Sequence, residues 1–361
     1  MAGSGLSFGS RSLAVFGILL LATQQYYPGT LLVLQLGETA AWLLSLMSGA
    51  FVLLLVWPVA AALRRIKGGS MHDLVRAAFG RPGVLLHAPL LSAALLMLCA
   101  ITLRETSEMA LTANFPHTPQ TVAVITLLGA AILVAASRKE SLVWAARMTI
   151  GPVIVGLAVI VLGTVGWGTP GFLAPFWGPG PLALVQRTPI AAFHYAPLGV
   201  VYALADGVSD RSRLVKALLL IPAVGALIYA AAKANLLMIY SYPTGVTITF
   251  PVHQAARLVI GGRFFERIEG LWLFIWVMGT IAYMAALLHV SALALTRAFG
   301  IKKLHIALLP MASAVLSLAY FPVDQAQTIL LNETMALPIT AITLGLPVIC
   351  AAVAAARGRL K

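Results

Sequence analysis

Ten long apolar stretches constrain the fold of this chain more than any other feature. About 20 consecutive apolar residues form a helix that can cross the hydrocarbon core of a bilayer. The chain is 60% hydrophobic and only 10% charged, and a soluble domain of 361 residues could not cover so much apolar surface. The sequence therefore predicts an all-α integral membrane protein with ten transmembrane spans, at approximately 13–34, 41–63, 84–110, 119–137, 141–164, 187–206, 217–240, 265–296, 304–321 and 329–356.

The distribution of basic residues predicts the orientation of these helices. Cytoplasmic loops of membrane proteins carry an excess of Lys and Arg. A cytoplasmic amino terminus puts most of the 24 basic residues inside and leaves Arg187, Arg257, Arg263 and Arg267 outside, so we expect both termini to be cytoplasmic. The net charge of +13 then follows from topology and from contact with the anionic lipid bilayer. We expect no nucleic-acid partner.

The chain is expected to form a single membrane domain over residues 1–361. The cytoplasmic segment 68–82 predicts a short amphipathic helix that is closed by Gly80, Arg81 and Pro82. Two outer loops are long, at 166–188 and 241–264, and we expect a short helix in the second one after its proline at position 251.

Polar residues interrupt the first apolar stretch near its middle, in the sequence TQQYYPGT at 23–30. One interpretation is a proline kink whose glutamines bond to neighbouring helices. The other is a discontinuous helix of the kind found in secondary transporters, which predicts a second broken span in the other half of the molecule. The sixth stretch supplies such a break, with His194, Pro197 and Gly199 near its centre. We therefore favour two discontinuous spans, the first and the sixth.

Charged residues in three of the predicted spans are candidates for a role inside the bundle. Arg104 and Glu108 share a face of the third span by their i,i+4 spacing, and they predict either an internal ion pair or a gate beneath the outer loops. Arg267 and Glu269 lie at the outer end of the eighth span, and we expect Glu269 to contact Arg104 while Arg267 serves another helix or loop. For Lys233 in the seventh span, the sequence favours snorkelling to the outer interface over a functional cation.

Enzymatic chemistry has little support in the sequence. The chain contains no HExxH, P-loop or GxSxG motif. Its seven histidines are scattered, and Cys99 and Cys350 both fall inside predicted spans. We therefore expect no catalytic residues, no metal site and no cofactor.

Four segments occur in the order and spacing of a known family. They are Arg104-x-x-x-Glu108 followed by Thr118-Pro119, the loop FLAPFWGPGPLAL, the segment FPVHQAARLVIGGRFFERIEGLWLFIW with Arg267, Glu269 and Trp276, and FPVDQAQTI at 321–329. Together they resemble the spore germination permeases, the integral-membrane B subunits of germinant receptors (GerAB type), within the amino acid/polyamine/organocation transporter superfamily. Two features depart from that pattern. Val200 stands where relatives often carry an acid, and Tyr27-Pro28-Gly29 stands where they tend to have Gly-x-Gly.

The resemblance implies a LeuT-like fold of two inverted five-helix repeats, at about 13–164 and 187–356. It also implies a pocket between spans one, three, six and eight that recognises a small germinant such as an amino acid. Broken helices expose N–H groups suited to a carboxylate and carbonyls suited to an ammonium group. The candidate ligand-binding residues are Thr23, Gln24, Gln25, Tyr26, Gly29, His194, Tyr195, Gly199 and Tyr202, and the candidate gate or ion-pair network is Arg104, Glu108, Arg267 and Glu269.

Two functions are compatible with these features. The first is a ligand-sensing subunit that acts with a larger A-type membrane subunit and a C-type lipoprotein in the spore inner membrane. The second is a stand-alone secondary transporter of amino acids or related solutes. The missing acid after Gly199 favours sensing, and we expect the receptor role.

Overall fold

The computed structural model describes residues 7–26, 29–113, 115–259 and 268–360, and side chains at 26, 113, 268 and 269 lie outside that description. The described part is built from helices and loops, with one isolated β-bridge between Phe8 and Val208. The α-helices are α1 (Ser10–Thr23), α2 (Gly29–Gly37), α3 (Ala41–Arg65), α4 (Met71–Ala113), α5 (Gln120–Ala135), α6 (Lys139–Gly163), α7 (Pro181–Ala191), α8 (Leu198–Leu204), α9 (Leu214–Tyr240), α10 (Thr244–Thr247), α11 (Pro251–Arg257), α12 (Ile268–Phe299), α13 (Leu304–Ala319), α14 (Gln325–Thr340) and α15 (Leu346–Ala356).

Each predicted span coincides with one helix or with a pair of helices. Six helical stretches are long and apolar enough to cross a membrane, the bent pair α7 and α8 adds a seventh, and α1, α5 and α13 are shorter apolar helices. This inventory is consistent with ten spans. Large apolar side chains such as Leu54, Leu133 and Met148 are more than 70% exposed on the surface of the bundle. Lipid is the solvent suited to such a surface, so the chain is an integral membrane protein.

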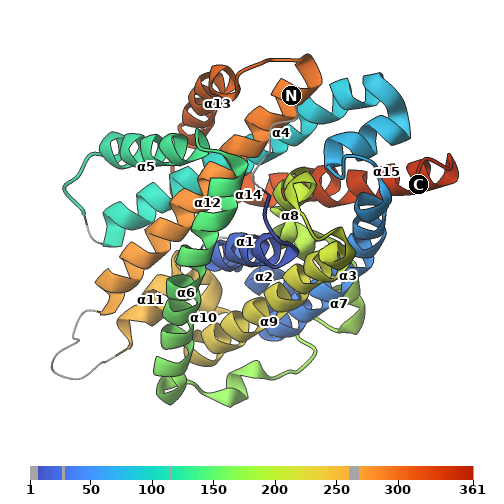
Figure 1. The fold of residues 1–361 in the computed structure, drawn as a ribbon. Helices are drawn as coiled ribbons and strands as arrows, with labels where there is room; N and C mark the ends of the chain where they lie inside the picture. Colours follow the sequence, from blue (N-terminus) through green and yellow to red (C-terminus); the bar gives the residue numbers. More distant parts are fainter. Residues whose placement is uncertain (1–6, 27–28, 114, 260–267, 361) are drawn as a thin grey trace.

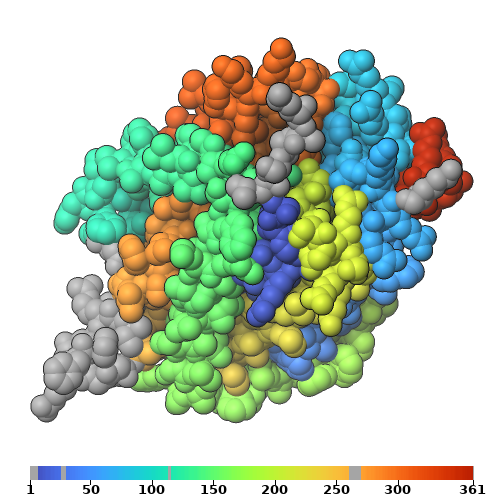
Figure 2. Space-filling model, in the orientation of Figure 1, coloured from blue at the N-terminus to red at the C-terminus, as the bar shows by residue number. Residues whose placement is uncertain are grey.

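The first helix lies inside the bundle. In Figure 1, α1 and α8 lie near the centre, α4 and α12 run alongside each other, and α9 runs along α3. On the face shown in Figure 2, α1 appears as a blue strip between the green α6 and the yellow α9, and it packs against both. A large cluster of buried apolar side chains joins these helices into one core. Polar groups of the first span are therefore enclosed by protein.

The structure confirms the predicted interruptions and corrects one boundary. Gly80, with φ 72° and ψ −159°, separates the amphipathic start of α4 from its apolar remainder, and α11 is the short helix expected after Pro251. The sixth span begins earlier than predicted, because α7 starts at Pro181 inside the stretch assigned to an outer loop. Gly180 adopts φ 104° there, and proline at the first helical position is well suited to start a helix.

Candidate functional site

The first span is broken where the sequence predicts. Helix α1 ends at Thr23, a 3-10 turn covers Gln24–Tyr26, and α2 begins at Gly29. The Thr23 hydroxyl donates to the Leu19 carbonyl at 2.9 Å, and the Thr30 hydroxyl donates to the Gln25 carbonyl at 2.8 Å. The Thr30 hydroxyl thus satisfies a backbone carbonyl within the break, as a non-helical segment at membrane depth requires.

The sixth span has the matching break. Helix α7 ends at Ala191, a 3-10 turn covers Ala192–Tyr195, and α8 begins at Leu198. The two pieces are bent by 51°. His194 and Tyr195 lie in the turn and are buried. The discontinuous first and sixth helices are therefore confirmed.

Tyr229 of α9 ties the two breaks together. Its hydroxyl oxygen lies 2.9 Å from the Leu21 carbonyl oxygen at the end of α1 and 3.0 Å from the His194 carbonyl oxygen. Its ring meets those of His194 and Tyr195 edge-on, with centroid distances of 5.2 Å to each. The sequence analysis did not single out Tyr229, although it lies one helical turn before Lys233 and shares its face.

Lys233 is a buried part of this cluster, which corrects the expectation of snorkelling. Its side chain is 0% exposed. Nζ donates to the Gln25 side-chain oxygen at 2.9 Å and to the Thr30 hydroxyl at 3.2 Å, and it lies 5.8 Å from the centroid of the Tyr229 ring. Helix α9 packs along α1, so the lysine points into the bundle toward the broken span and not along the lipid to the interface.

The eighth span completes the enclosure of the first break. The Gln24 side-chain amide donates to the Tyr283 hydroxyl of α12. A Cβ atom at Gly279, one turn earlier in α12, would lie 3.1 Å from the Thr23 hydroxyl oxygen. Glycine at this position lets α12 approach α1 closely. Spans one, six, seven and eight therefore meet at the polar cluster, which we define as Gln24, Gln25, Thr30, His194, Tyr195, Tyr229, Lys233 and Tyr283.

Some buried polar atoms of the cluster have unused hydrogen-bonding capacity. In the described part of the chain, the Gln25 side-chain nitrogen has no hydrogen-bond partner, and the hydrogen-bond contact of the His194 ring there is with the Ala191 backbone. Buried polar groups are usually paired, because an unpaired one costs about 1–3 kcal/mol. Unpaired groups at a helix break are suited to bind a polar ligand.

The remaining predicted ligand residues lie apart from the cluster or outside the description. Gly199 faces span ten, where a Cβ atom would lie 3.2 Å from the Thr343 methyl group. Tyr202 is buried two turns beyond Tyr195 in α8. Gly29 begins α2, and the side chain of Tyr26 is outside the described residues. The structure thus assembles Gln24, Gln25, His194 and Tyr195 with Thr23 beside them, and it does not bring Gly199 to the same place.

Half of the predicted ion-pair network can be located. Arg104 forms an ion pair with Glu108 one turn later in α4, and Arg104 Nη2 donates to the Val323 carbonyl at 3.3 Å. Arg267 and the Glu269 side chain lie outside the described residues. The expected contact of Glu269 with Arg104 therefore lies outside them as well. Glu108 also lines a cavity of about 460 Å³ at the predicted outer end of the bundle, together with Thr112, Ile248, Thr249, Phe250, Gln254 and Gln325.

The opposite end of the bundle is closed by ionic and backbone contacts. Asp206, just after α8, binds Lys139 of α6 at 3.1 Å and Arg297 of α12 at 2.7 Å. The Phe8 backbone pairs with Gly207 and Ser209. Burial disfavours the ionised form of Asp210, but hydrogen bonds from the Ser10 hydroxyl and amide outweigh this effect and hold the pKa of Asp210 below its ordinary value.

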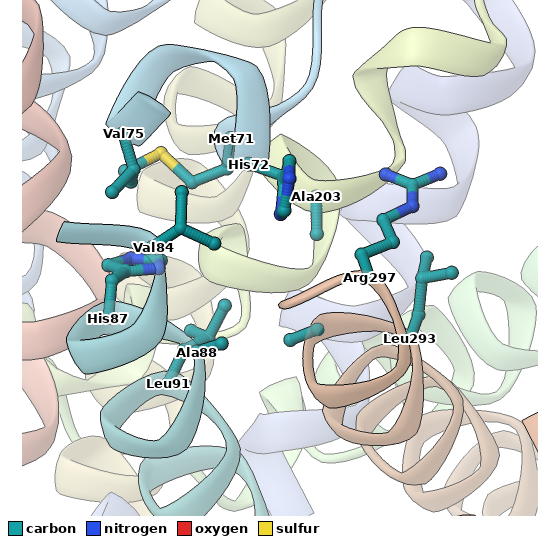
Figure 3. Close-up of a pocket in the computed structure, with 11 residues that line it drawn as sticks. Met71, His72, Val75, Val84, His87, Ala88, Leu91, Ala203, Leu293 and Arg297 are labelled. Atoms are coloured by element: carbon teal, nitrogen blue, oxygen red, sulfur yellow. The ribbon is translucent and has the colours of Figure 1, made fainter. Parts of the chain in front are cut away.

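Figure 3 shows a small cavity near this closed end, and it is too small to be a solute site. His72, His87 and Arg297 line it together with the apolar side chains of Met71, Val75, Val84, Ala88, Leu91, Ala203, Leu293 and Ala294. Its volume is about 20 Å³, room for about one water molecule. In the described residues, no group of three or more His, Cys, Asp or Glu side chains could hold a metal ion.

Comparisons with known proteins agree with this architecture. A family model described as "Spore germination protein" matches residues 14–328. Among solved structures, MHP1, a nucleobase-cation-symport-1 family transporter in a closed conformation with bromovinylhydantoin bound, is 14% identical with a TM-score of 0.65, covering 90% of this chain and 75% of that chain. MhsT in complex with L-phenylalanine is 12% identical with a TM-score of 0.65, covering 96% of this chain and 92% of that chain. A search of the curated proteins finds no match. At these identities the structural likeness shows the fold alone, which is that of LeuT-like transporters.

Proposed function

Since this chain belongs to the spore germination protein family and has a transporter-type fold, we propose that it is the germinant-recognising membrane subunit of a spore germinant receptor. Its partners would be an A-type membrane subunit and a C-type lipoprotein in the spore inner membrane, with both of its own termini in the cytoplasm. Family membership supports this assignment.

The observation that carries the proposal is the link between the two broken spans through Tyr229. One hydroxyl lies within hydrogen-bond distance of carbonyls at both breaks, and the unpaired amide nitrogen of Gln25 and the buried ring of His194 belong to the same cluster. Their side chains are almost fully buried, so a solute must separate the breaks to reach them. A ligand shifts a protein toward the state that it binds better, and separation of the breaks would move the helices that adjoin partner subunits.

We propose that the solute is an amino acid or a similar small molecule. The MhsT structure holds L-phenylalanine, and the present chain shares its fold. In our proposal, Gln24, Gln25, His194 and Tyr195 contact the solute, with Thr23 and the start of α2 at Gly29 around them. Tyr26 adjoins these residues in sequence, whereas Gly199 and Tyr202 contribute by packing span six.

A stand-alone secondary transporter is the second candidate, favoured by the likeness to the transporter MHP1. Reconstitution of the purified chain alone into liposomes separates the two candidates, with labelled amino acids offered from outside and both binding and uptake measured. Saturable binding without uptake supports the receptor subunit. Saturable uptake overturns it in favour of the transporter, and the absence of any binding contradicts both.

A further inference from the structure

We propose that Lys233 is the fixed cation of the solute site, so that the solute must present a negatively charged group, specifically a carboxylate. The proposal rests on the function proposed above, because it concerns the same polar cluster. It goes further by assigning a role to a residue that lies on span seven, outside the predicted pocket.

Lys233 is a buried amine that has no carboxylate partner in the described part of the chain. Its side chain is fully buried, and its hydrogen-bond acceptors are the neutral oxygens of Gln25 and Thr30. No carboxylate within the described residues forms an ion pair with it, and the ion pairs observed there involve other lysines and arginines. A buried ion is strongly destabilising unless a partner of opposite charge compensates it. A bound carboxylate would supply that partner.

The polar atoms around the ammonium have spare capacity to donate hydrogen bonds. The unpaired nitrogen of Gln25 belongs to the same amide whose oxygen accepts from Lys233. His194 and Lys233 both approach the Tyr229 ring, at 5.2 Å between ring centroids and 5.8 Å from Nζ to the centroid. A carboxylate has two oxygens with about four acceptor sites and no donor, so it can bind the ammonium and the Gln25 amide together.

A second buried ionisable residue does not fulfil this role in the described structure. Glu105 of α4 is 2% exposed and one of its carboxylate oxygens has no hydrogen-bond partner, but it forms no ion pair with Lys233. An ammonium at Lys233 that no carboxylate of the described residues compensates would therefore make the site selective. Amines that lack a carboxylate would place a second positive charge beside Lys233 and should be excluded, since like charges in a low-dielectric interior repel strongly.

The test measures binding of the twenty L-amino acids to the purified full-length chain, and then of the amide of each amino acid that binds. An amino-acid amide keeps the ammonium group and the side chain but lacks the negative charge. Hydrogen bonds to charged groups have strengths that correspond to tenfold or more in affinity. Wild type should therefore bind the acid at least tenfold more tightly than its amide, and Lys233→Met should reduce that preference to within about twofold. Lys216→Met, an exposed lysine on the same helix, should leave it unchanged.

A second variant keeps the proposal testable if Lys233→Met does not fold. Gln25→Glu places a carboxylate of the protein next to Nζ, so it should reduce the ratio of acid affinity to amide affinity at least tenfold. Equal binding of acid and amide by wild type, or an undiminished preference in a folded variant, overturns the role of Lys233 while the proposed function stands. If wild type binds no small solute at all, the proposed function itself fails and this proposal with it.

Discussion

The hydrogen bond from Lys233 to Gln25 makes a quantitative prediction about the variant Gln25→Leu. Leucine is close to glutamine in size but lacks the oxygen that accepts from Nζ at 2.9 Å. Because the volume is nearly conserved, the substitution removes the polar contact without opening a large cavity. The ammonium then keeps only the Thr30 hydroxyl at 3.2 Å and the face of the Tyr229 ring.

The expected cost follows from the charge on the donor. A hydrogen bond to a charged group contributes about 1.5–3 kcal/mol, and both groups here are fully buried. Gln25→Leu should therefore lower the free energy of unfolding by about that amount in the wild-type background. In a Lys233→Met background the same substitution should lower the free energy of unfolding far less, because no ammonium is present to lose its hydrogen-bond acceptor. The coupling energy of the double-mutant cycle should be at least about 1 kcal/mol.

Thermal unfolding of the four proteins in detergent, followed by tryptophan fluorescence, measures this coupling. Gln186→Leu provides the control, since Gln186 is exposed on α7, and it should show no coupling to Lys233. We also expect Gln25→Leu to weaken solute binding while expression is largely retained. Additive effects of Gln25→Leu and Lys233→Met on stability would refute the buried contact, and unchanged solute affinity would favour a plain structural kink.

Three further predictions concern contacts at the closed end and at the centre of the bundle. Tyr229→Phe removes the hydroxyl between the breaks and should lower stability by about 1 kcal/mol, whereas Tyr240→Phe at the end of the same helix should have little effect in the same melting assay. Asp206→Asn weakens both ion pairs of this partly exposed network and should lower stability by about 1 kcal/mol. The loss should be smaller in 1 M salt, and a loss that does not depend on salt would contradict a Coulombic role. Because the folded-state pKa of Asp210 lies below its unfolded value, its carboxylate stabilises the fold above about pH 4 and that contribution is lost as the pH falls through the lowered pKa. Between pH 5 and pH 3 the melting temperature of Ser10→Ala should therefore fall less than that of wild type. An equal fall would contradict the contribution of the Ser10 hydrogen bonds to the lowered pKa of Asp210.

Sequence reasoning located the spans and their breaks because each has a local signal. Apolar stretches of membrane-spanning length are visible without any tertiary information, and Pro28 and Pro197 mark the interruptions because each stands with a glycine and polar residues near the middle of a span. Glycine with positive φ at Gly80 likewise acts within a few residues. The beginning of α7 was missed because residues 181–188 follow a loop rich in Gly and Pro, which obscured the helix start.

The composition of the polar cluster depends on contacts that no local pattern encodes. Lys233 is separated by about 200 residues from Gln25 and Thr30. Its position along α9 is compatible with snorkelling to the interface as well as with burial. Tyr229 and Tyr283 had no signal of their own, because single tyrosines are common in membrane helices. A useful signal was the i,i+4 pair of Tyr229 and Lys233 in an otherwise apolar helix, since an ionisable residue within a span is a functional hypothesis by default.

Photo-crosslinking with a diazirine-bearing amino acid tests most directly whether solute binds at the broken spans. The purified chain is illuminated with the probe, digested and mapped by mass spectrometry, with excess unlabelled amino acid as competitor. The account predicts competable labelling in residues 19–30 and 191–202, together with the segment of α9 around Lys233. Competable labelling confined to the outer cavity beside Glu108 and Gln325 would contradict it.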